Sequence, residues 1–256
     1  MPTFLFDDII FGPVQSRRMG VSLGVNLLPK TIKYCNFNCI YCECGFTPLA
    51  NKEISHLLPS RQDVAKHLTS YLQNNTIKPD AITFAGNGEP TIHPDFCEII
   101  NDVIAIRNEF APKTEIVVLT NATQIHKPSI LQALEKVDRC MFKLDSAIES
   151  TIRAINQPGK QLNVQDFIKH ISLFKGKKII QTLCISGEHN GVQISNITDT
   201  EINALIEVYK KINPDEVVLY TIQRDTPIET LQKISKETLE KFAKKVELAG
   251  IKTIVS

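Results

Sequence analysis

The sequence predicts an α/β fold in which parallel strands are joined by helical crossovers. From about Asp80 onward, short apolar runs alternate with amphipathic stretches of helical spacing. Several apolar runs are continuous, as in strands that are covered on both faces of a parallel sheet. Roughly six or seven such units in order fit an open doubly wound sheet or a full or partial barrel. No G-x-G-x-x-G motif follows a strand, which disfavours a dinucleotide site.

The expected strands are rich in Ile, Val, Phe and Thr, which favour extended structure. The first is Val21–Leu27, which leads into a cysteine-rich loop. The others are expected at Ala81–Ala85, Ile116–Thr120, Cys140–Asp145, Ile179–Ile185, Glu216–Ile222 and Lys252–Val255.

The expected helices lie between these strands. Ser60 fits an N-cap, Pro94 and Pro128 fit first-turn positions, and Gly250 fits the residue that ends a helix. The predicted ranges are Ser60–Gln73, Pro94–Phe110, Pro128–Lys136, Val164–Phe174, Asp199–Ile212 and Lys236–Ala249.

We expect one domain over residues 1–256, because the chain has no obvious linker and its hydrophobic fraction of 43% is ample for one core. Residues 1–30 form a lead-in and the first strand, residues 31–50 a loop, and residues 51–256 the remaining β/α units.

Charge and hydropathy favour a cytoplasmic enzyme acting on a small molecule. The formal net charge is +1, without the basic excess that nucleic-acid or membrane-surface binding usually requires. The N-terminus has no signal-peptide pattern, and no apolar stretch reaches the ~18 residues of a membrane helix. An odd number of cysteines, seven, indicates reduced thiols rather than disulfides.

Four of these cysteines lie between positions 35 and 44, and Cys35, Cys39 and Cys42 have the spacing C-x3-C-x2-C. Thiolates suit iron–sulfur clusters, copper(I) or zinc. Three thiolates bind three irons of a cubane and leave one iron open, whereas an electron-transfer cluster normally has four. Chance clustering of buried thiols and a zinc site completed by Cys44 are the alternatives.

This motif, with the aromatic Tyr41 before its last cysteine, resembles the defining motif of the radical S-adenosylmethionine superfamily. The resemblance implies a partial (β/α)6-type TIM-like barrel. It also implies that Cys35, Cys39 and Cys42 hold a [4Fe–4S] cluster whose open iron is chelated by S-adenosylmethionine, and that Tyr41 lies against the adenine.

A second segment is similar to the Gly-Gly-Glu-Pro element of the same superfamily. Gly86, Asn87, Gly88 and Glu89 follow the strand Ala81–Ala85, with Asn87 in place of the first glycine. Glycine permits close backbone approach, and a carboxylate accepts hydrogen bonds from an ammonium group. The resemblance implies that this element binds the methionine amino group.

Further segments resemble a narrower group of small, single-domain radical enzymes related to the tRNA wyosine-synthesis enzymes. The lead-in from Phe11 to Gly20 carries this likeness, as do Leu119-Thr120-Asn121 and Phe142-Lys143-Leu144-Asp145.

Residues at the carboxyl ends of barrel strands face the site. This rule selects Asn121, Lys143, Asp145, Glu188 and Arg224. Lys143 and Asp145 lie two apart and share a face, so they are candidates to hold ribose hydroxyls or the methionine carboxylate. Together with Cys44, they are also the candidates for catalytic residues.

Two other features concern the arginines of the lead-in and the remaining cysteines. Arg17 and Arg18 are candidates to hold an anionic substrate, although adjacent arginines are more often surface charge. Cys97, Cys140 and Cys184 stand singly and have no ligand spacing, which disfavours a second cluster.

The family resemblance implies reductive cleavage of S-adenosylmethionine to methionine and a 5′-deoxyadenosyl radical, which abstracts hydrogen from an unidentified substrate that we expect to be small. Whether the outcome is that of an oxidoreductase, a lyase or a transferase stays open. The electron would come from flavodoxin or ferredoxin. The alternatives are a tRNA-modifying wyosine-type enzyme and a non-catalytic iron–sulfur electron carrier or sensor.

Overall fold

Parallel strands form the centre of the fold in the computed structural model, which describes residues 4–16, 18–48, 54–159 and 162–256. Neighbouring strands in the order β2-β3-β4-β5-β6-β8-β10 pair in parallel. Their bounds are β2 Gly20–Val25, β3 Ala81–Phe84, β4 Glu115–Thr120, β5 Arg139–Lys143, β6 Lys178–His189, β8 Glu216–Thr221 and β10 Thr253–Val255.

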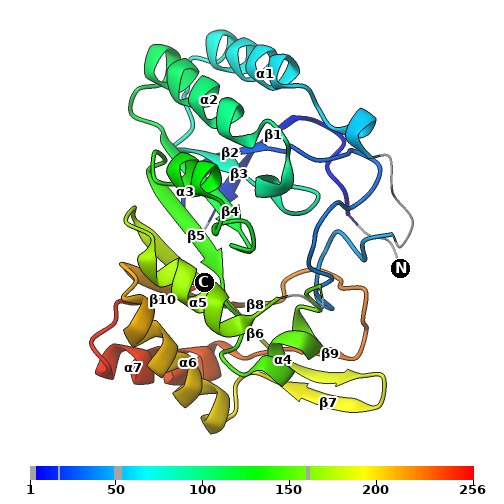
Figure 1. The fold of residues 1–256 in the computed structure, drawn as a ribbon, viewed down its shortest axis with the longest axis vertical. Coiled ribbons are helices and arrows are strands. Elements are labelled where there is room, and N and C mark those ends of the chain that lie inside the picture. The colour runs from blue at the N-terminus through cyan, green and yellow to red at the C-terminus, as the bar shows by residue number, and fades with distance from the viewer. Residues whose placement is uncertain (1–3, 17, 49–53, 160–161) are drawn as a thin grey trace.

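Helices connect these strands and cover the outer side of the curved sheet (Figure 1). They are α1 Arg61–Asn74, α2 Phe96–Phe110, α3 Pro128–Leu134, α4 Glu149–Ile155, α5 Val164–Leu173, α6 Asp199–Ile212 and α7 Lys236–Leu248, with short 3-10 turns η1 Ser55–Leu57 and η2 Pro90–Ile92. The architecture is a partial TIM barrel, which confirms the predicted fold class.

Helix ends follow the chemistry of capping, with one correction. Ser60 accepts a hydrogen bond from the backbone N–H of Asp63 at 3.1 Å and caps α1, and Pro128 begins α3, as predicted. Gly250 has φ +83° just after α7. The prediction for Pro94 was wrong, because α2 begins at Phe96 after the N-cap Asp95 and leaves Pro94 outside the first turn.

The sequence pattern did not predict three of the strands and one of the α-helices. β1 (Ile10–Ser16) pairs antiparallel with β2 in the lead-in. β6 continues beyond the barrel, where β7 (Val192–Ser195) and β9 (Leu231–Lys233) pair with it antiparallel. Helix α4 was also missed, because its seven residues show no clear helical period and, unlike the equally short α3, it has no first-turn proline to mark its start.

Two apolar layers set the depth of the barrel. The larger core packs the outer face of the sheet against the helices, and includes Leu72 and Phe142. A smaller cluster of Met19, Ala81, Val117, Met141, Ile179 and Val218 comes mainly from the starts of the strands. This second cluster, which we call the apolar floor, closes the amino-terminal end of the barrel. It leaves the carboxyl-terminal end for polar groups.

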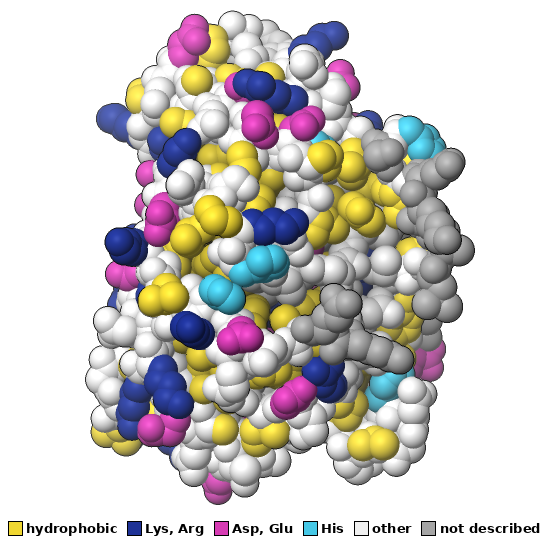
Figure 2. All heavy atoms as spheres, viewed as in Figure 1, with side chains coloured by type: hydrophobic (Ala, Val, Ile, Leu, Met, Phe, Trp, Pro, Cys, Tyr) yellow, Lys and Arg dark blue, Asp and Glu magenta, His cyan; other side chains and the backbone are white. Residues whose placement is uncertain are grey.

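No helix in the described ranges is long and apolar enough to cross a bilayer. Figure 2 shows basic and acidic side chains interspersed over one face of the molecule, in keeping with the formal net charge of +1.

Two leucines test the core. Leu72 in α1 is fully buried, whereas Leu248 at the end of α7 is 81% exposed. We expect Leu72→Ala to lower the free energy of unfolding by about 2–5 kcal/mol, because it leaves a cavity. Leu248→Ala should change it by less than about 0.5 kcal/mol. Urea denaturation measures both values, and equal midpoints for the two variants would contradict this packing.

Candidate functional site

A cavity of about 230 Å³ lies at the carboxyl-terminal end of the barrel, above the apolar floor. It brings together most of the residues selected from the sequence, although they come from separate loops and strands. Among its lining residues are Cys35, Cys39, Tyr41, Cys42, Gly86, Gly88, Glu89, Asn121 and Lys143.

The cysteine loop is held from two sides by backbone hydrogen bonds. On one side, the Tyr34 N–H donates to Asn87 O at 2.8 Å and the Glu89 N–H donates to Tyr34 O at 3.2 Å. On the other side, the Ile40 N–H donates to Ile155 O, at the end of α4, at 3.0 Å. The loop therefore lies between the glycine turn after β3 and the end of α4.

Gly88 makes the first of these contacts possible. A Cβ at this position would lie 1.9 Å from the backbone oxygen of Tyr34, and φ is +148°. No L side chain fits so close to backbone. Gly86, with φ +131°, meets Asn26 in the same way, at 2.4 Å from its Oδ1. Because Gly86 and Gly88 have no side chains, the turn can lie directly against Asn26 and the cysteine loop.

The three thiols differ in their electrostatic surroundings. Burial raises the pKa of Cys35 and of Cys39. A side-chain hydrogen bond with Cys44 lowers the pKa of Cys42, and the ammonium of Lys33 acts in the same direction. Amide groups point at two of the sulfurs: Asn156 Nδ2 lies 3.5 Å from Cys39 Sγ, and Asn121 Nδ2 lies 3.8 Å from Cys35 Sγ.

This donor set fits an iron–sulfur cluster. Three soft sulfur ligands line one cavity, and N–H donors and a buried cation surround them, which favours the anionic thiolates of a cluster. In the described part of the chain, no group of three or more His, Cys, Asp or Glu side chains converges as a single-ion site. The ligands of a cubane bind separate irons, so they do not need to converge on a single ion.

Glu89 is buried, and its carboxylate is held by neighbours on two segments. Its Oε1 accepts hydrogen bonds from the Thr91 and Thr120 hydroxyls at 2.5 and 2.6 Å, and from the Thr91 N–H at 3.1 Å. Its Oε2 accepts from the Asn121 N–H at 2.6 Å. Burial raises the pKa of Glu89, although these donors oppose the shift. With one donor on it, Oε2 keeps the capacity to accept another.

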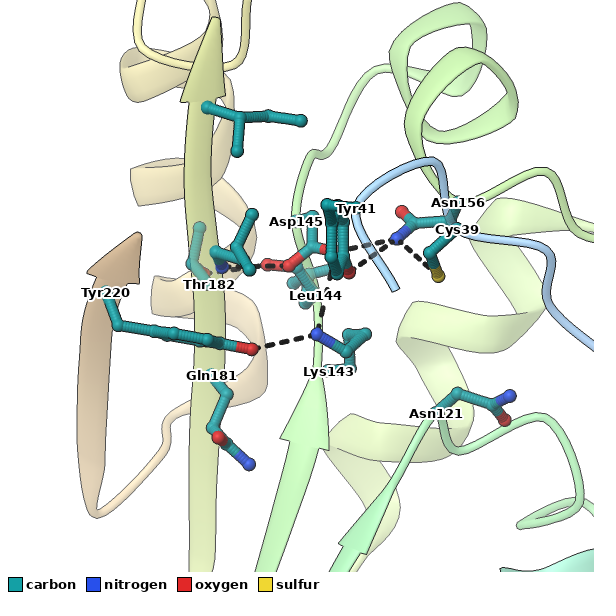
Figure 3. Close-up of polar contacts among 12 residues, drawn as sticks. Cys39, Tyr41, Asn121, Lys143, Leu144, Asp145, Asn156, Gln181, Thr182 and Tyr220 are labelled. Atoms are coloured by element: carbon teal, nitrogen blue, oxygen red, sulfur yellow. Dashed lines mark hydrogen bonds and ion pairs between the residues drawn. The ribbon is translucent and has the colours of Figure 1, made fainter. Parts of the chain in front are cut away.

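A hydrogen-bond network around Asp145 connects the cysteine loop to the strands (Figure 3). Tyr41 Oη donates to Asp145 Oδ2, and Asn156 Nδ2 donates to the same oxygen at 2.6 Å. Asp145 Oδ1 accepts from the Leu183 N–H of β6 at 2.9 Å. Both carboxylate oxygens are therefore used in positioning neighbours, and Asp145 itself does not line the cavity.

Lys143 lies between the Asp145 network and the cavity. Its Nζ is 3.9 Å from Asp145 Oδ2 and donates to Tyr220 Oη at 2.9 Å. Burial alone would lower the pKa of Lys143, but the charge of Asp145, with Tyr220 and Cys39, raises it above its ordinary value. Lys143 is consequently a cation near neutral pH, suited to binding oxyanions and hydroxyls.

Other selected residues lie elsewhere or have other partners. The Asn87 side chain bonds the backbone of Phe6 and Pro29 and is absent from the cavity lining. Glu188 lies in the β6–β7 hairpin, beyond the barrel, where it accepts from Gln193 at 3.3 Å.

Arg224 is 65% exposed and pairs with Glu43 at 2.7 Å. Arg17 lies outside the described residues. Cys97, Cys140 and Cys184 do not line the cavity, and Cys44 Sγ lies 3.5 Å from the backbone oxygen of Gly86.

Three residues of the site, Asn156, Gln181 and Tyr220, were not predicted from the sequence. Gln181 and Tyr220 line the cavity from β6 and β8, and strand alternation contains the signal for both. Each lies two residues after a floor residue, Ile179 or Val218, and therefore on the inner face. Asn156 directly follows the unpredicted helix α4 and had no such pattern.

Comparison with known proteins gives a family and a fold. The family model described as "Radical SAM superfamily" matches residues 30–207. A UPF0026 protein from Helicobacter pylori strain J99 is 30% identical, over 91% of this chain and 72% of the relative. A protein from Brachyspira hyodysenteriae named GTPase Obg is 29% identical over 93% of this chain, which spans only 33% of that relative.

Solved structures support the architecture. Streptococcus suis SuiB, solved with S-adenosylmethionine, has a TM-score of 0.64 and 14% identity, over 90% of this chain and 50% of SuiB. TYW1, solved with a lysine–pyruvate adduct, has a TM-score of 0.60 and 15% identity, over 89% of this chain and 73% of TYW1. At these identities the likeness concerns the fold alone.

Gly88→Ala tests the contact between the turn and the cysteine loop. We expect a larger loss in free energy of unfolding than for Gly250→Ala, which has a positive φ of +83° but open space around it. The control should lose about 1–2 kcal/mol from backbone strain alone, while Gly88→Ala adds a clash with the Tyr34 backbone. Chemical denaturation compares the two, and equal losses would refute the close-approach role of Gly88.

Proposed function

This chain belongs to the radical SAM superfamily and to the UPF0026 proteins, and we propose that it is a [4Fe–4S]-dependent enzyme that cleaves S-adenosylmethionine reductively and abstracts hydrogen from a substrate. One observation carries the proposal: the three cysteine thiols, the glycine turn and Glu89 line a single cavity.

In this proposal Cys35, Cys39 and Cys42 hold the cluster. When bound, the cluster and cofactor supply one-electron cleavage of the sulfonium to methionine and a 5′-deoxyadenosyl radical. The amides of Asn121 and Asn156 support two of the three sulfurs, and the Lys33 charge supports the third. Their task is to keep the thiolates charged and oriented in a buried setting.

Glu89 and the glycine turn would receive the methionine end of the cofactor. Glu89 Oε2 has one donor and can accept another, and an ammonium group is such a donor. Gly86 and Gly88 let backbone line the cavity without side chains in the way. The backbone of Asn87 would help to form this wall, while its side chain fixes the turn to the lead-in.

Tyr41, Lys143 and Asp145 would hold the adenosyl end. Tyr41 is buried, and its ring lies 5.0 Å from Lys143 Nζ. Lys143 can donate to ribose hydroxyls or to the methionine carboxylate, and Asp145 fixes Lys143 and Tyr41 in place. Asn121 closes the opposite wall beside Cys35.

We further propose flavodoxin or ferredoxin as the reductant and a small molecule as the substrate. The mixed charges on the face seen in Figure 2 favour this substrate over tRNA.

The proposed activity has a direct test. The protein is reconstituted anaerobically with iron and sulfide, then given S-adenosylmethionine and dithionite. Methionine and 5′-deoxyadenosine should appear in equal amounts. Absence of both products from protein with a full cluster would overturn the proposal and leave an electron carrier or sensor as the alternative.

Cysteine variants test which thiols bind the cluster. Single Cys35→Ser, Cys39→Ser and Cys42→Ser variants should each lose most of the reconstituted iron and sulfide, because three ligands are the minimum for the cluster. Cys44→Ser and Cys97→Ser should keep wild-type iron and sulfide. Loss of the metal in Cys44→Ser would instead indicate a site with four cysteine ligands.

Glu89→Gln should weaken S-adenosylmethionine binding by about tenfold to a hundredfold, because it replaces a charged acceptor by a neutral one. Equilibrium binding to the reconstituted protein measures the effect, after iron analysis confirms the cluster. The exposed Glu98→Gln on α2 is the matched control. Unchanged affinity in Glu89→Gln would remove Glu89 from the cofactor site.

A further inference from the structure

Arg18 reaches into the barrel from the turn between β1 and β2. Its guanidinium donates to Gln181 Oε1 on β6, and its Cζ lies 5.1 Å from the centre of the Tyr220 ring on β8. In the sheet order, β6 and β8 are separated from β1 and β2 by three other strands. Arg18 thus crosses the open interior of the barrel rather than pointing outward as a surface charge.

The position of Arg18 is shared by two cavities. It lines the inner cavity and also a second cavity of about 630 Å³, which extends between the lead-in and the loop after β8. Tyr220 lines both as well. In Figure 3, Tyr220, Gln181 and Lys143 project from neighbouring strands into the same space. Arg18 and Tyr220 therefore lie where the two cavities adjoin.

One wall of the outer cavity is aromatic. The rings of Phe6 and Phe11 are stacked with centroids 3.7 Å apart. The Phe11 ring packs directly on Gly24 of β2, where a Cβ would lie 2.1 Å from the ring. Both phenylalanines are half-buried and line the cavity. Such a wall suits an apolar, ring-sized portion of a ligand.

Cationic side chains outnumber carboxylates in the lining of the two cavities. Four cationic side chains line them, Arg18, Lys33, Lys143 and Arg224, against two acidic ones, Glu43 and Glu89. Glu43 already pairs with Arg224, and Glu89 already accepts four hydrogen bonds. Lys143 likewise faces Asp145 at 3.9 Å, so the preference for an anion rests on the donors of the Arg18 guanidinium at the junction of the two cavities and not on a net charge.

We propose that the substrate is an acid whose carboxylate or phosphate group binds Arg18, with an apolar portion against Phe6 and Phe11. A guanidinium presents a planar fork of donors that matches either oxyanion. Gln181 and Tyr220 act as positioning residues that hold the guanidinium at the junction of the cavities. This inference rests on the proposed function for the site's location, and it assigns the substrate's chemical class.

The test uses three probes with one phenyl ring each: benzoate, phenyl phosphate and the neutral benzyl alcohol. Ligand-observed NMR measures their binding to the anaerobically reconstituted protein. At least one anion should bind, and more tightly than benzyl alcohol. Arg18→Gln should weaken that binding by about tenfold or more, Arg18→Lys should restore part of it, and Arg61→Gln on the outer helix α1 should leave it unchanged. The two anions distinguish a carboxylate from a phosphate.

The proposal is overturned if neither anion binds at millimolar concentration, if benzyl alcohol binds as tightly, or if Arg18→Gln binds as wild type does. Circular dichroism of each variant verifies folding, and Arg18→Lys gives the answer if Arg18→Gln does not fold. The probes report binding alone, so a protein that binds them through Arg18 but produces no 5′-deoxyadenosine would refute the proposed function and not this assignment.

Discussion

The arrangement of the site depends on the contacts that the buried carboxylate of Asp145 makes. It accepts hydrogen bonds from Tyr41 on the cysteine loop, from Asn156 after α4 and from the Leu183 N–H on β6, and it lies 3.9 Å from Lys143 Nζ. A fully buried charge is stable only when it is paired and hydrogen-bonded, so these four groups are held together by one electrostatic requirement.

Backbone geometry supplies the second constraint. The cysteine loop has no regular structure of its own at most positions, and its place is set by hydrogen bonds to the glycine turn and to the end of α4. The apolar floor from Met19 to Val218 blocks the other end of the barrel. Polar and sulfur-containing groups therefore lie together at the carboxyl-terminal end. There, hydrogen bonds and ion pairs among these groups offset the cost of removing them from water.

The sequence predicted the parallel units and the residues at their ends because burial on both faces leaves a clear pattern. The strand ends at Asn121 and Lys143 were found in this way. Glu188 was selected by the same rule and lies in a hairpin, because β6 continues past the barrel rim and only pairing with β7 and β9 reveals its length. Asn156 and the inward reach of Arg18 depend on contacts between distant segments, which no local pattern records. The role of each cofactor residue stays a prediction.

The central claim is that three thiolates leave one iron of the cluster open to S-adenosylmethionine. Electron paramagnetic resonance of the dithionite-reduced, reconstituted protein tests it most directly. Addition of S-adenosylmethionine should change the g-values of the reduced cluster, because amino and carboxylate groups become iron ligands. A cluster signal that is identical with and without the cofactor would contradict the account.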